Sequence, residues 1–254
     1  MHIIAPTYQE IADTKSFKST SLTFQHPKDI LKPVLDQIGH LADSITYQAV
    51  VGSVNVNDDL TDNRAYSHLM MQASFGSEFG LEDKLLFIYR LDKAPSVTIA
   101  SGPMVSACMN MCVFGSKYRQ TSDPTRNGFS LAYSFLSERF LPNRDKWKDQ
   151  ALDKVAMLRS QVIPQAQIET AFGKVYREVL ANRSGISLDS DLVNAAVRQA
   201  FTPEAMWSVH KNPEWTKWDM FNCLTQGVKH KAMDSLVDKS IACYRLVTEV
   251  VDAY

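Results

Sequence analysis

Two cysteines, Cys108 and Cys112, lie four residues apart in an apolar run, "MVSACMNMCVF". On a strand this spacing separates the two side chains by about 13 Å, too far for one zinc ion with Zn–S bonds of about 2.3 Å. On a helix the thiols would be neighbours, but zinc would need two further ligands, and the chain has no second closely spaced Cys/His pair. We therefore predict thiols that pack in the core, with no metal and no cofactor.

No other arrangement of reactive side chains stands out. The histidines are dispersed at His2, His26, His40, His68, His210 and His230. There is no nucleophile-elbow motif, and "FGSEFG" lacks the lysine and the following helix of a phosphate-binding loop. We predict that the protein is not an enzyme, while a thiol enzyme that uses Cys108 or Cys112 stays as a third hypothesis.

A cationic segment follows the cysteines. Residues 113–148 hold seven Lys or Arg against three Asp or Glu, an excess of four positive charges. Aromatic residues are interleaved, and cations that follow a phosphate backbone beside rings that stack on bases are typical of single-strand binding. We predict that single-stranded DNA contacts Lys117, Tyr118, Arg119, Arg126, Arg144, Lys146, Trp147 and Lys148. The alternative, core rings with a solvated charged loop, stays open.

Composition limits the possible classes of protein. The chain has 254 residues, 45% hydrophobic and 22% charged, with a net charge of -1, which is typical of a soluble globular protein. A nucleic-acid site must therefore be a local patch. No run approaches the roughly 20 apolar residues of a membrane span, and the N-terminus has no secretory-signal pattern. We expect a cytoplasmic protein with no membrane partner.

The elements that would position these residues change in kind along the chain. Short runs rich in Val, Tyr and Ile predict an antiparallel meander, with Ser101-Gly102-Pro103 as the turn before the cysteine strand. The predicted strands are 46–58, 65–75, 83–92, 96–100 and 104–114.

Helical periodicity begins in the second half. Pro164 predicts a helix boundary, Asp189 or Ser187 a helix start, and Thr202-Pro203 another. The predicted helices are 145–163, 165–185, 187–201, 202–210, 216–230 and 232–254. We predict an α+β fold in which a mostly β region, 1–128, packs against a mostly α-helical region, 129–254, as one compact unit.

Two short motifs carry a family resemblance. One is the Cys-x-Asn strand with Cys108 and Asn110, and the other is "TKWDMFNCLTQGVKH" near the C-terminus. The matching positions of the second are Trp218, Asp219, Phe221, Asn222, Thr225 and His230. In order and spacing these motifs resemble those of a large family of phage- and plasmid-like proteins of unknown function. This chain has "KYRQTSDPT" where the family often has a basic signature with a histidine, so a function tied to that histidine is not expected.

The resemblance implies a mobile-element protein that acts in DNA replication or recombination in a bacterial host. Together with the cationic segment, it favours a non-enzymatic phage-type protein that binds or anneals single-stranded DNA and that forms a homo-oligomer. The alternative is a protein-binding module that captures or inhibits a host protein, because the methionine-rich stretches permit an adaptable surface.

Overall fold

The computed structural model describes residues 3–14, 26–52, 65–90, 96–106, 110–181, 188–228 and 235–251. The chain divides into two compact units. The sheet unit comprises Met1–Ser101 and Lys117–Arg144, and the helical unit comprises Gly102–Ser116 and Asp145–Tyr254. The prediction of an α+β chain, with an antiparallel sheet in its N-terminal part and helices after it, is confirmed.

The sheet is built mainly from consecutive strands. They are β1 (Ile3–Ile4), β2 (Ser44–Gly52), β3 (Ala65–Glu78), β4 (Leu81–Arg90) and β5 (Ser96–Val105). Two short strands, β6 (Asn110–Met111) and β7 (Arg119–Ser122), both pair antiparallel with β5. The predicted strands coincide with β2, β3, β4 and the first part of β5, whereas residues 53–58 and 91–92 lie outside the described residues.

The hairpin between β3 and β4 turns within two residues. Phe79 and Gly80 have φ values of 52° and 76°, and Glu78 pairs with Leu81 on either side of them. Two consecutive positive φ values define a type I′ turn, whose twist matches that of the strands. Gly80 adopts this conformation without a steric penalty.

The expected turn at Ser101-Gly102-Pro103 is wrong, because β5 continues through these residues. A Cβ on Gly102 would lie 2.2 Å from the carbonyl oxygen of Cys112. The Cys112 N–H donates to the carbonyl of Pro103 at 2.8 Å. Glycine is therefore required here by the close approach of the next chain segment rather than by a change of direction.

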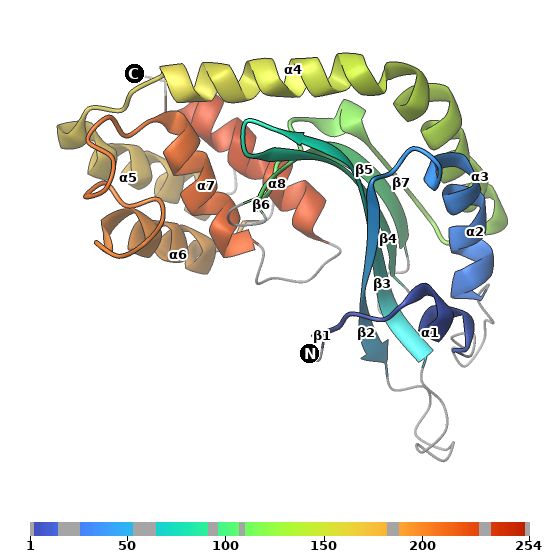
Figure 1. Cartoon of the computed structure of the whole chain (residues 1–254). Coiled ribbons are helices and arrows are strands. Elements are labelled where there is room, and N and C mark those ends of the chain that lie inside the picture. The colour runs from blue at the N-terminus through green and yellow to red at the C-terminus, as the bar shows by residue number, and fades with distance from the viewer. Residues whose placement is uncertain are drawn as a thin grey trace. The chain divides into compact units, whose positions relative to one another are not determined.

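Helices α2 (Pro27–Ile38) and α3 (Arg126–Ser134) lie along one face of the sheet (Figure 1). The ring of Tyr89 on β4 packs 5.6 Å from Phe129 on α3, and the Tyr133 hydroxyl of α3 donates to the carbonyl of Ile30 on α2. A short helix, α1 (Tyr8–Ala12), buries Ile11. The sequence did not predict these helices, partly because Pro33 stands inside α2.

These helices explain why the observed division differs from the predicted boundary after residue 128. Helix α3 and the π-helical segment η2 (Phe135–Phe140) belong to the sheet unit. Their Phe129, Phe135 and Phe140 are buried, so an apolar face of this region completes the core of the sheet unit.

The helical unit contains most of the remaining helices. They are α5 (Gln165–Ala181), α6 (Ser190–Phe201), α7 (Lys217–Val228) and α8 (Leu236–Arg245), together with α4 (Leu141–Ser160) from Asp145 onward. Pro164 separates α4 from α5, and the Asp189 carboxylate caps α6 by accepting from the Leu192 N–H at 2.9 Å. Both boundaries were predicted from the sequence.

The helix predicted at 202–210 is wrong, because this segment forms turns. The Thr202 N–H donates to the Arg198 carbonyl, which makes Thr202 the C-cap of α6. The Ala205 N–H then donates to the Thr202 carbonyl at 3.0 Å. Thr-Pro often begins a helix, but here Thr202 is the C-cap of the preceding helix α6.

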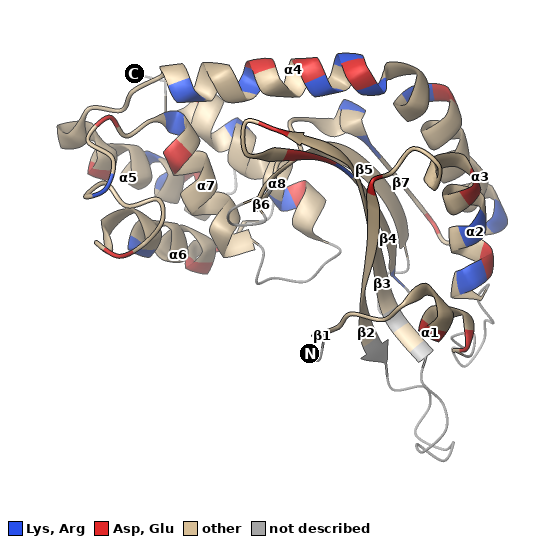
Figure 2. Cartoon of the chain, viewed as in Figure 1, with Lys and Arg blue, Asp and Glu red and all other residues tan. Residues whose placement is uncertain are grey.

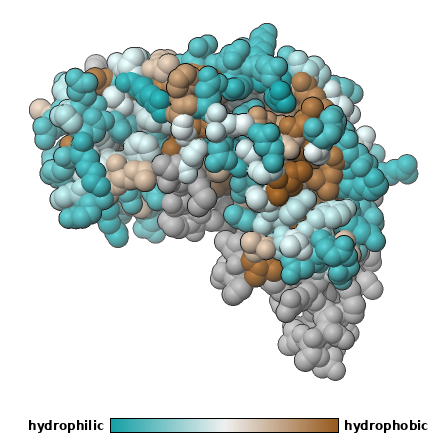
Figure 3. All heavy atoms as spheres, in the orientation of Figure 1, coloured by the Kyte–Doolittle hydropathy of each residue, from teal (hydrophilic) through white to brown (hydrophobic). Residues whose placement is uncertain are grey.

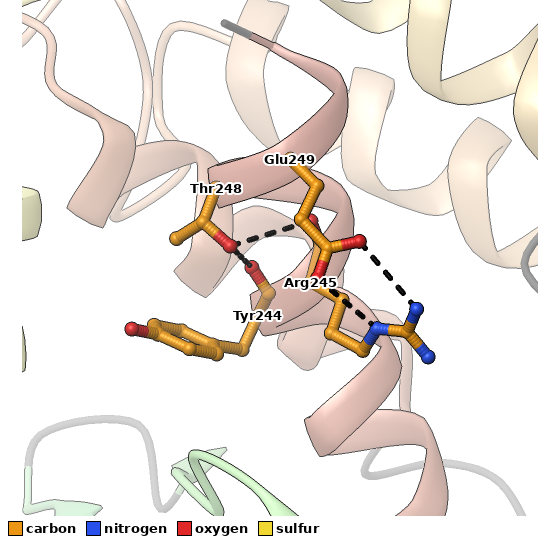
Figure 4. Close-up of polar contacts among 4 residues, drawn as sticks. All are labelled: Tyr244, Arg245, Thr248 and Glu249. Atoms are coloured by element: carbon orange, nitrogen blue, oxygen red, sulfur yellow. Dashed lines mark hydrogen bonds and ion pairs between the residues drawn. The ribbon is translucent and has the colours of Figure 1, made fainter.

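In the described part of the chain, η2 and η4 (Leu246–Val250) are π-helical segments that each join an α-helix. A π-helical turn shifts the backbone bonds by one residue and leaves carbonyls to be satisfied by other donors. In η4 the Thr248 hydroxyl lies 2.9 Å from the Tyr244 carbonyl, while Arg245 pairs with Glu249 (Figure 4). In η2 the Ser137 hydroxyl donates to the Tyr133 carbonyl at 3.1 Å. Each π segment thus carries a hydroxyl at its third residue.

Candidate nucleic-acid interface

The sheet unit has two different sheet faces. Residues that alternate along a strand point to opposite faces, and residues directly opposite on paired antiparallel strands share a face. The face that carries Tyr89 is the helix face, because Tyr89 packs on Phe129 of α3. We call the other one the polar face. Its polar residues on β2, β3 and β4 are Ser44, Thr46, Gln48, His68, Gln72, Ser74, Glu82, Lys84 and Arg90, with apolar residues between them.

Strand β7 places Arg119 on the polar face. The Ser122 hydroxyl donates to the carbonyl of Gly128 in α3, so Ser122 points to the helix face. Arg119 and Thr121 alternate with Ser122 and therefore point to the polar face. Arg119 lies opposite Ala100, and the Thr121 hydroxyl is 2.9 Å from that of Thr98.

Arg119 is half-buried, and burial lowers the pKa of its guanidinium. The direction of this shift follows from desolvation, which disfavours the charged form. The side chain stays positively charged at neutral pH because an arginine titrates far above it. A partly desolvated cation gains more from a nearby anion than a fully hydrated one.

Tyr118 does not meet the expectation of an exposed stacking ring. It ends the short helix η1 (Ser116–Tyr118), and only 3% of its surface is exposed. The Lys117 ammonium lies 4.8 Å from the centre of the Tyr118 ring, and Lys117 itself is exposed. Tyr118 is therefore an anchor between two cationic residues rather than a platform for a base, because a base cannot reach a ring that is buried in the protein.

Arg126 begins α3 and is exposed. The corner between β7 and α3 is tightly built, since the Gly128 N–H donates to the Thr125 hydroxyl oxygen at 3.2 Å. A Cβ on Gly128 would lie only 1.7 Å from the carbonyl oxygen of Asp123. This close approach fixes where α3 leaves the strand, and with it the backbone that carries Arg126.

The other predicted residues lie on α4. Lys146 is exposed, and Arg144, Trp147 and Lys148 are half-buried. Arg144 belongs to the sheet unit, where its guanidinium lies 5.6 Å from the ring of Phe75, whereas Lys146, Trp147 and Lys148 belong to the helical unit. Figure 2 shows cationic and acidic residues alternating along α4. Helix α4 is therefore of mixed charge, and a joint surface of these residues with β7 stays a prediction.

Sequence reasoning missed Arg90, the last residue of β4, which is half-buried on the polar face. Lys84 lies on the same face, but it is buried and pairs with Glu82 at 2.7 Å. The centre of the face is apolar and buried at Met70, Leu86 and Ile88. Lys84 and Arg90 are six residues apart in "LEDKLLFIYR", and an even spacing places two side chains on one face of a strand.

The two motifs of the family resemblance meet inside the helical unit. The Asn110 side-chain amide on β6 donates to the backbone oxygen and to Oδ1 of Asn222 on α7, at 3.2 and 3.3 Å. The Asn222 amide in turn donates to the Trp218 carbonyl at 2.8 Å. Asn110 and Asn222 are 1% and 0% exposed, so these amides join β6 to α7 within the interior.

The remaining motif residues of α7 have structural partners as well. The Thr216 N–H and hydroxyl donate to the Asp219 carboxylate at 2.8 and 2.7 Å, and the Asp219 N–H lies 3.4 Å from the Thr216 hydroxyl oxygen. This reciprocal pair is a capping box at the helix start. The Thr225 hydroxyl donates to the Phe221 carbonyl, and Trp218 stacks on Phe221 at 5.7 Å. Cys108 and His230 lie outside the described residues.

The described thiols are buried. Cys112 is 0% exposed, and burial raises the pKa of Cys223 well above its ordinary value and that of Cys243 to about 12. A buried, protonated thiol is a poor nucleophile and a poor metal ligand. Among the described residues, no group of three His, Cys, Asp or Glu is arranged to hold a metal ion. Within the same residues, none of the helices is both long and apolar enough to span a membrane.

Comparisons with known proteins give no further guidance. No protein-family model, no curated protein and no solved structure matches this chain. The resemblance to phage- and plasmid-like proteins therefore stays a prediction, and the proposals below depend on the geometry alone.

Proposed function

We propose that the protein binds single-stranded DNA through the cationic edge of the sheet unit, with Arg119 at its centre and Lys117 and Arg126 beside it. The observation that carries the proposal is the placement of Arg119 and Thr121 on the polar face of the edge strand β7. Arg90 at the end of β4 adds a further cation to the same face.

The chemistry of Arg119 suits a phosphate group. A guanidinium can donate two parallel hydrogen bonds to phosphate oxygens, and such charge-assisted bonds are about twice as strong as neutral ones. The hydroxyls of Thr98 and Thr121 lie 2.9 Å apart, and when one donates to the other, the second retains a donor of its own. Cation and hydroxyl donors on one rigid strand form a row that can follow a sugar-phosphate backbone.

The contribution of ring stacking is smaller than the sequence suggested, because Tyr118 is buried. Backbone contacts then supply most of the affinity, so binding should be salt-dependent and only weakly selective for sequence. A role in replication or recombination in the cytoplasm of a bacterial host, including strand annealing, is the finer form of this proposal. It depends on the resemblance of the two motifs.

Fluorescence anisotropy with a labelled oligothymidylate tests the proposal. We expect Arg119→Gln to weaken binding about tenfold at low salt, because a hydrogen bond to a charged group contributes about 1.5 kcal/mol or more. The matched control is Lys28→Gln, which removes an exposed cation from α2, on the helix face. We expect the control to change affinity less than about twofold.

Two results would contradict the proposal. One is a wild-type protein that binds no oligothymidylate at low salt. The other is equal affinity for the wild-type protein and Arg119→Gln while Lys28→Gln weakens binding, because the contact would then lie on α2. Circular dichroism of each variant shows whether the fold is retained, and Arg119→Lys, which keeps the charge, should retain part of the affinity.

A further inference from the structure

The outer edge of β2 is a second surface of the sheet unit where another strand can bind. In the described chain this edge pairs only with β1, opposite Ala49 and Val50. Residues Ser44–Gln48 form strand pairs with β3 on their inner side alone. Alternate N–H and C=O groups of an edge strand point outward, where another strand can pair with them.

The side chains of this edge give little of the usual protection against pairing, although the Tyr8 ring of α1 lies 6.3 Å from that of Tyr47. Natural edge strands carry lysine, proline or inward charges that discourage another strand. Residues 44–48 read "SITYQ", with no charge, no proline and no glycine. Ser44 and Thr46 are exposed, and Ile45, Tyr47 and Gln48 are half-buried. Figure 3 shows an apolar area on the visible surface in the part of the molecule where Figure 1 draws β2.

We propose that β2 pairs antiparallel with β2 of a second copy of this chain, with Thr46 on the two-fold axis. This register sets Thr46 against its own counterpart and Ile45 against Tyr47 of the other copy. Thr–Thr pairs and pairs of an aromatic with a β-branched residue are among the favourable cross-strand pairs. Because the segment is uncharged, a second copy introduces no like-charge repulsion.

The faces of the sheet are consistent with this register. Ile45 and Tyr47 alternate with Thr46, so they share the helix face in both copies, while Thr46 lies on the polar face. A two-fold axis normal to the sheet keeps equivalent faces on the same side. The two polar faces therefore adjoin one another in the dimer. The pairing itself follows from the edge of β2 and does not depend on nucleic-acid binding.

A pairing of five residues covers less surface than a stable interface needs, so the dimer should form only at high protein concentration. Sedimentation velocity over a concentration series should show a reversible monomer–dimer equilibrium. Thr46→Lys places two like charges opposite one another and should weaken association about fivefold. Thr46→Glu should do the same.

An equimolar mixture of Thr46→Lys and Thr46→Glu gives the decisive result. The ammonium of one copy then faces the carboxylate of the other, and the mixture should associate more strongly than either variant alone. Ser130→Lys, at an exposed position of α3, is the matched control and should associate as the wild type does.

A variant that fails to fold would fail in the mixture too, so restored association excludes misfolding as the cause. A chain that stays monomeric at every concentration overturns the proposal and leaves the edge to an extended peptide of another protein. Association that is unchanged by both Thr46 variants, or not restored in the mixture, also overturns it.

Discussion

The corner formed by β7 and α3 and the helix α7 both contain polar residues that stand out in the sequence, but the two regions use them differently. At the corner, Lys117 and Arg126 are exposed and Arg119 is half-buried beside the anchored ring of Tyr118. On α7, Asp219 and Asn222 are buried and bonded within the protein. A polar residue within an apolar run can therefore serve the core alone, as on α7, whereas the corner keeps Lys117 and Arg126 at the surface.

The largest expected effect tests whether the corner is rigid. Gly128→Ala would put a Cβ 1.7 Å from the carbonyl oxygen of Asp123, so the backbone would have to move. We expect the free energy of unfolding to fall by about 3 kcal/mol or more in urea denaturation. Gly173→Ala on α5 is the matched control, since a Cβ there meets no atom of the structure within 4 Å. It should stabilise the protein by about 0.5–1 kcal/mol. A Gly128→Ala variant as stable as the wild type would show that the corner is adaptable.

The next effect tests whether the polar residues of α7 stabilise the fold. Asn222→Ala removes the donor to the Trp218 carbonyl and one acceptor of the Asn110 amide. The Asn110 amide then keeps only the backbone oxygen of Asn222, and the Trp218 carbonyl loses a donor in the interior, so the free energy of unfolding should fall by about 2–3 kcal/mol. Asn194→Ala, at an exposed position of α6, should change it by less than about 0.5 kcal/mol. If Asn222→Ala kept full stability but lost affinity for oligothymidylate, α7 rather than β7 would be the binding element.

A smaller effect tests whether the contribution of a buried hydroxyl to the free energy of unfolding depends on its hydrogen-bond partner. The Tyr133 hydroxyl donates to the Ile30 carbonyl at 2.9 Å, whereas the buried Tyr89 hydroxyl has no hydrogen-bond partner among the described residues. Tyr133→Phe should lower the unfolding free energy by about 1 kcal/mol, and Tyr89→Phe should leave it unchanged or raise it slightly. Equal losses in the two variants would contradict this distinction.

A further effect on stability is a pH dependence. Burial raises the pKa of Tyr133 to about 12, while an unfolded tyrosine titrates near pH 10. The folded chain therefore holds this proton when the unfolded chain has lost it, and the stabilisation, complete below pH ~10, is lost as the pH rises toward 12. Urea denaturation at increasing alkaline pH should give a shallower decline for Tyr133→Phe than for the wild type. Identical declines would show that Tyr133 does not contribute.

The regular strands and several helix ends were predictable because local patterns determine them. Runs rich in Val, Tyr and Ile indicated the strands, Pro164 separated two helices, and Asp189 capped α6. The turn at Gly102 was predicted wrongly, because this glycine serves the close approach of the segment at Cys112. The helix at 202–210 was predicted wrongly, because Thr202 ends α6. Only the tertiary structure reveals these two roles. Pro33 similarly obscured α2.

The candidate site was predictable in charge but not in geometry. The excess of positive charge in residues 113–148 pointed to Lys117, Arg119 and Arg126. Sequence alone could not show that the Tyr118 ring is buried. An aromatic residue between two cations looks the same in the sequence whether its ring packs in the core or stacks on a base. Nor could it place Arg90 and Arg119 on one face, because that placement follows from the contacts of Tyr89 and Ser122 with α3.

The salt dependence of oligothymidylate binding tests the central claim most directly. For single strands, the logarithm of the association constant falls with the logarithm of salt concentration by about 0.7 for each phosphate that is neutralised. The double variant Lys117→Gln/Arg119→Gln should therefore reduce the magnitude of the slope by about 1.4 relative to the wild type. A wild-type slope near zero, or an identical slope for the two proteins, would contradict the account that Lys117 and Arg119 carry phosphate contacts.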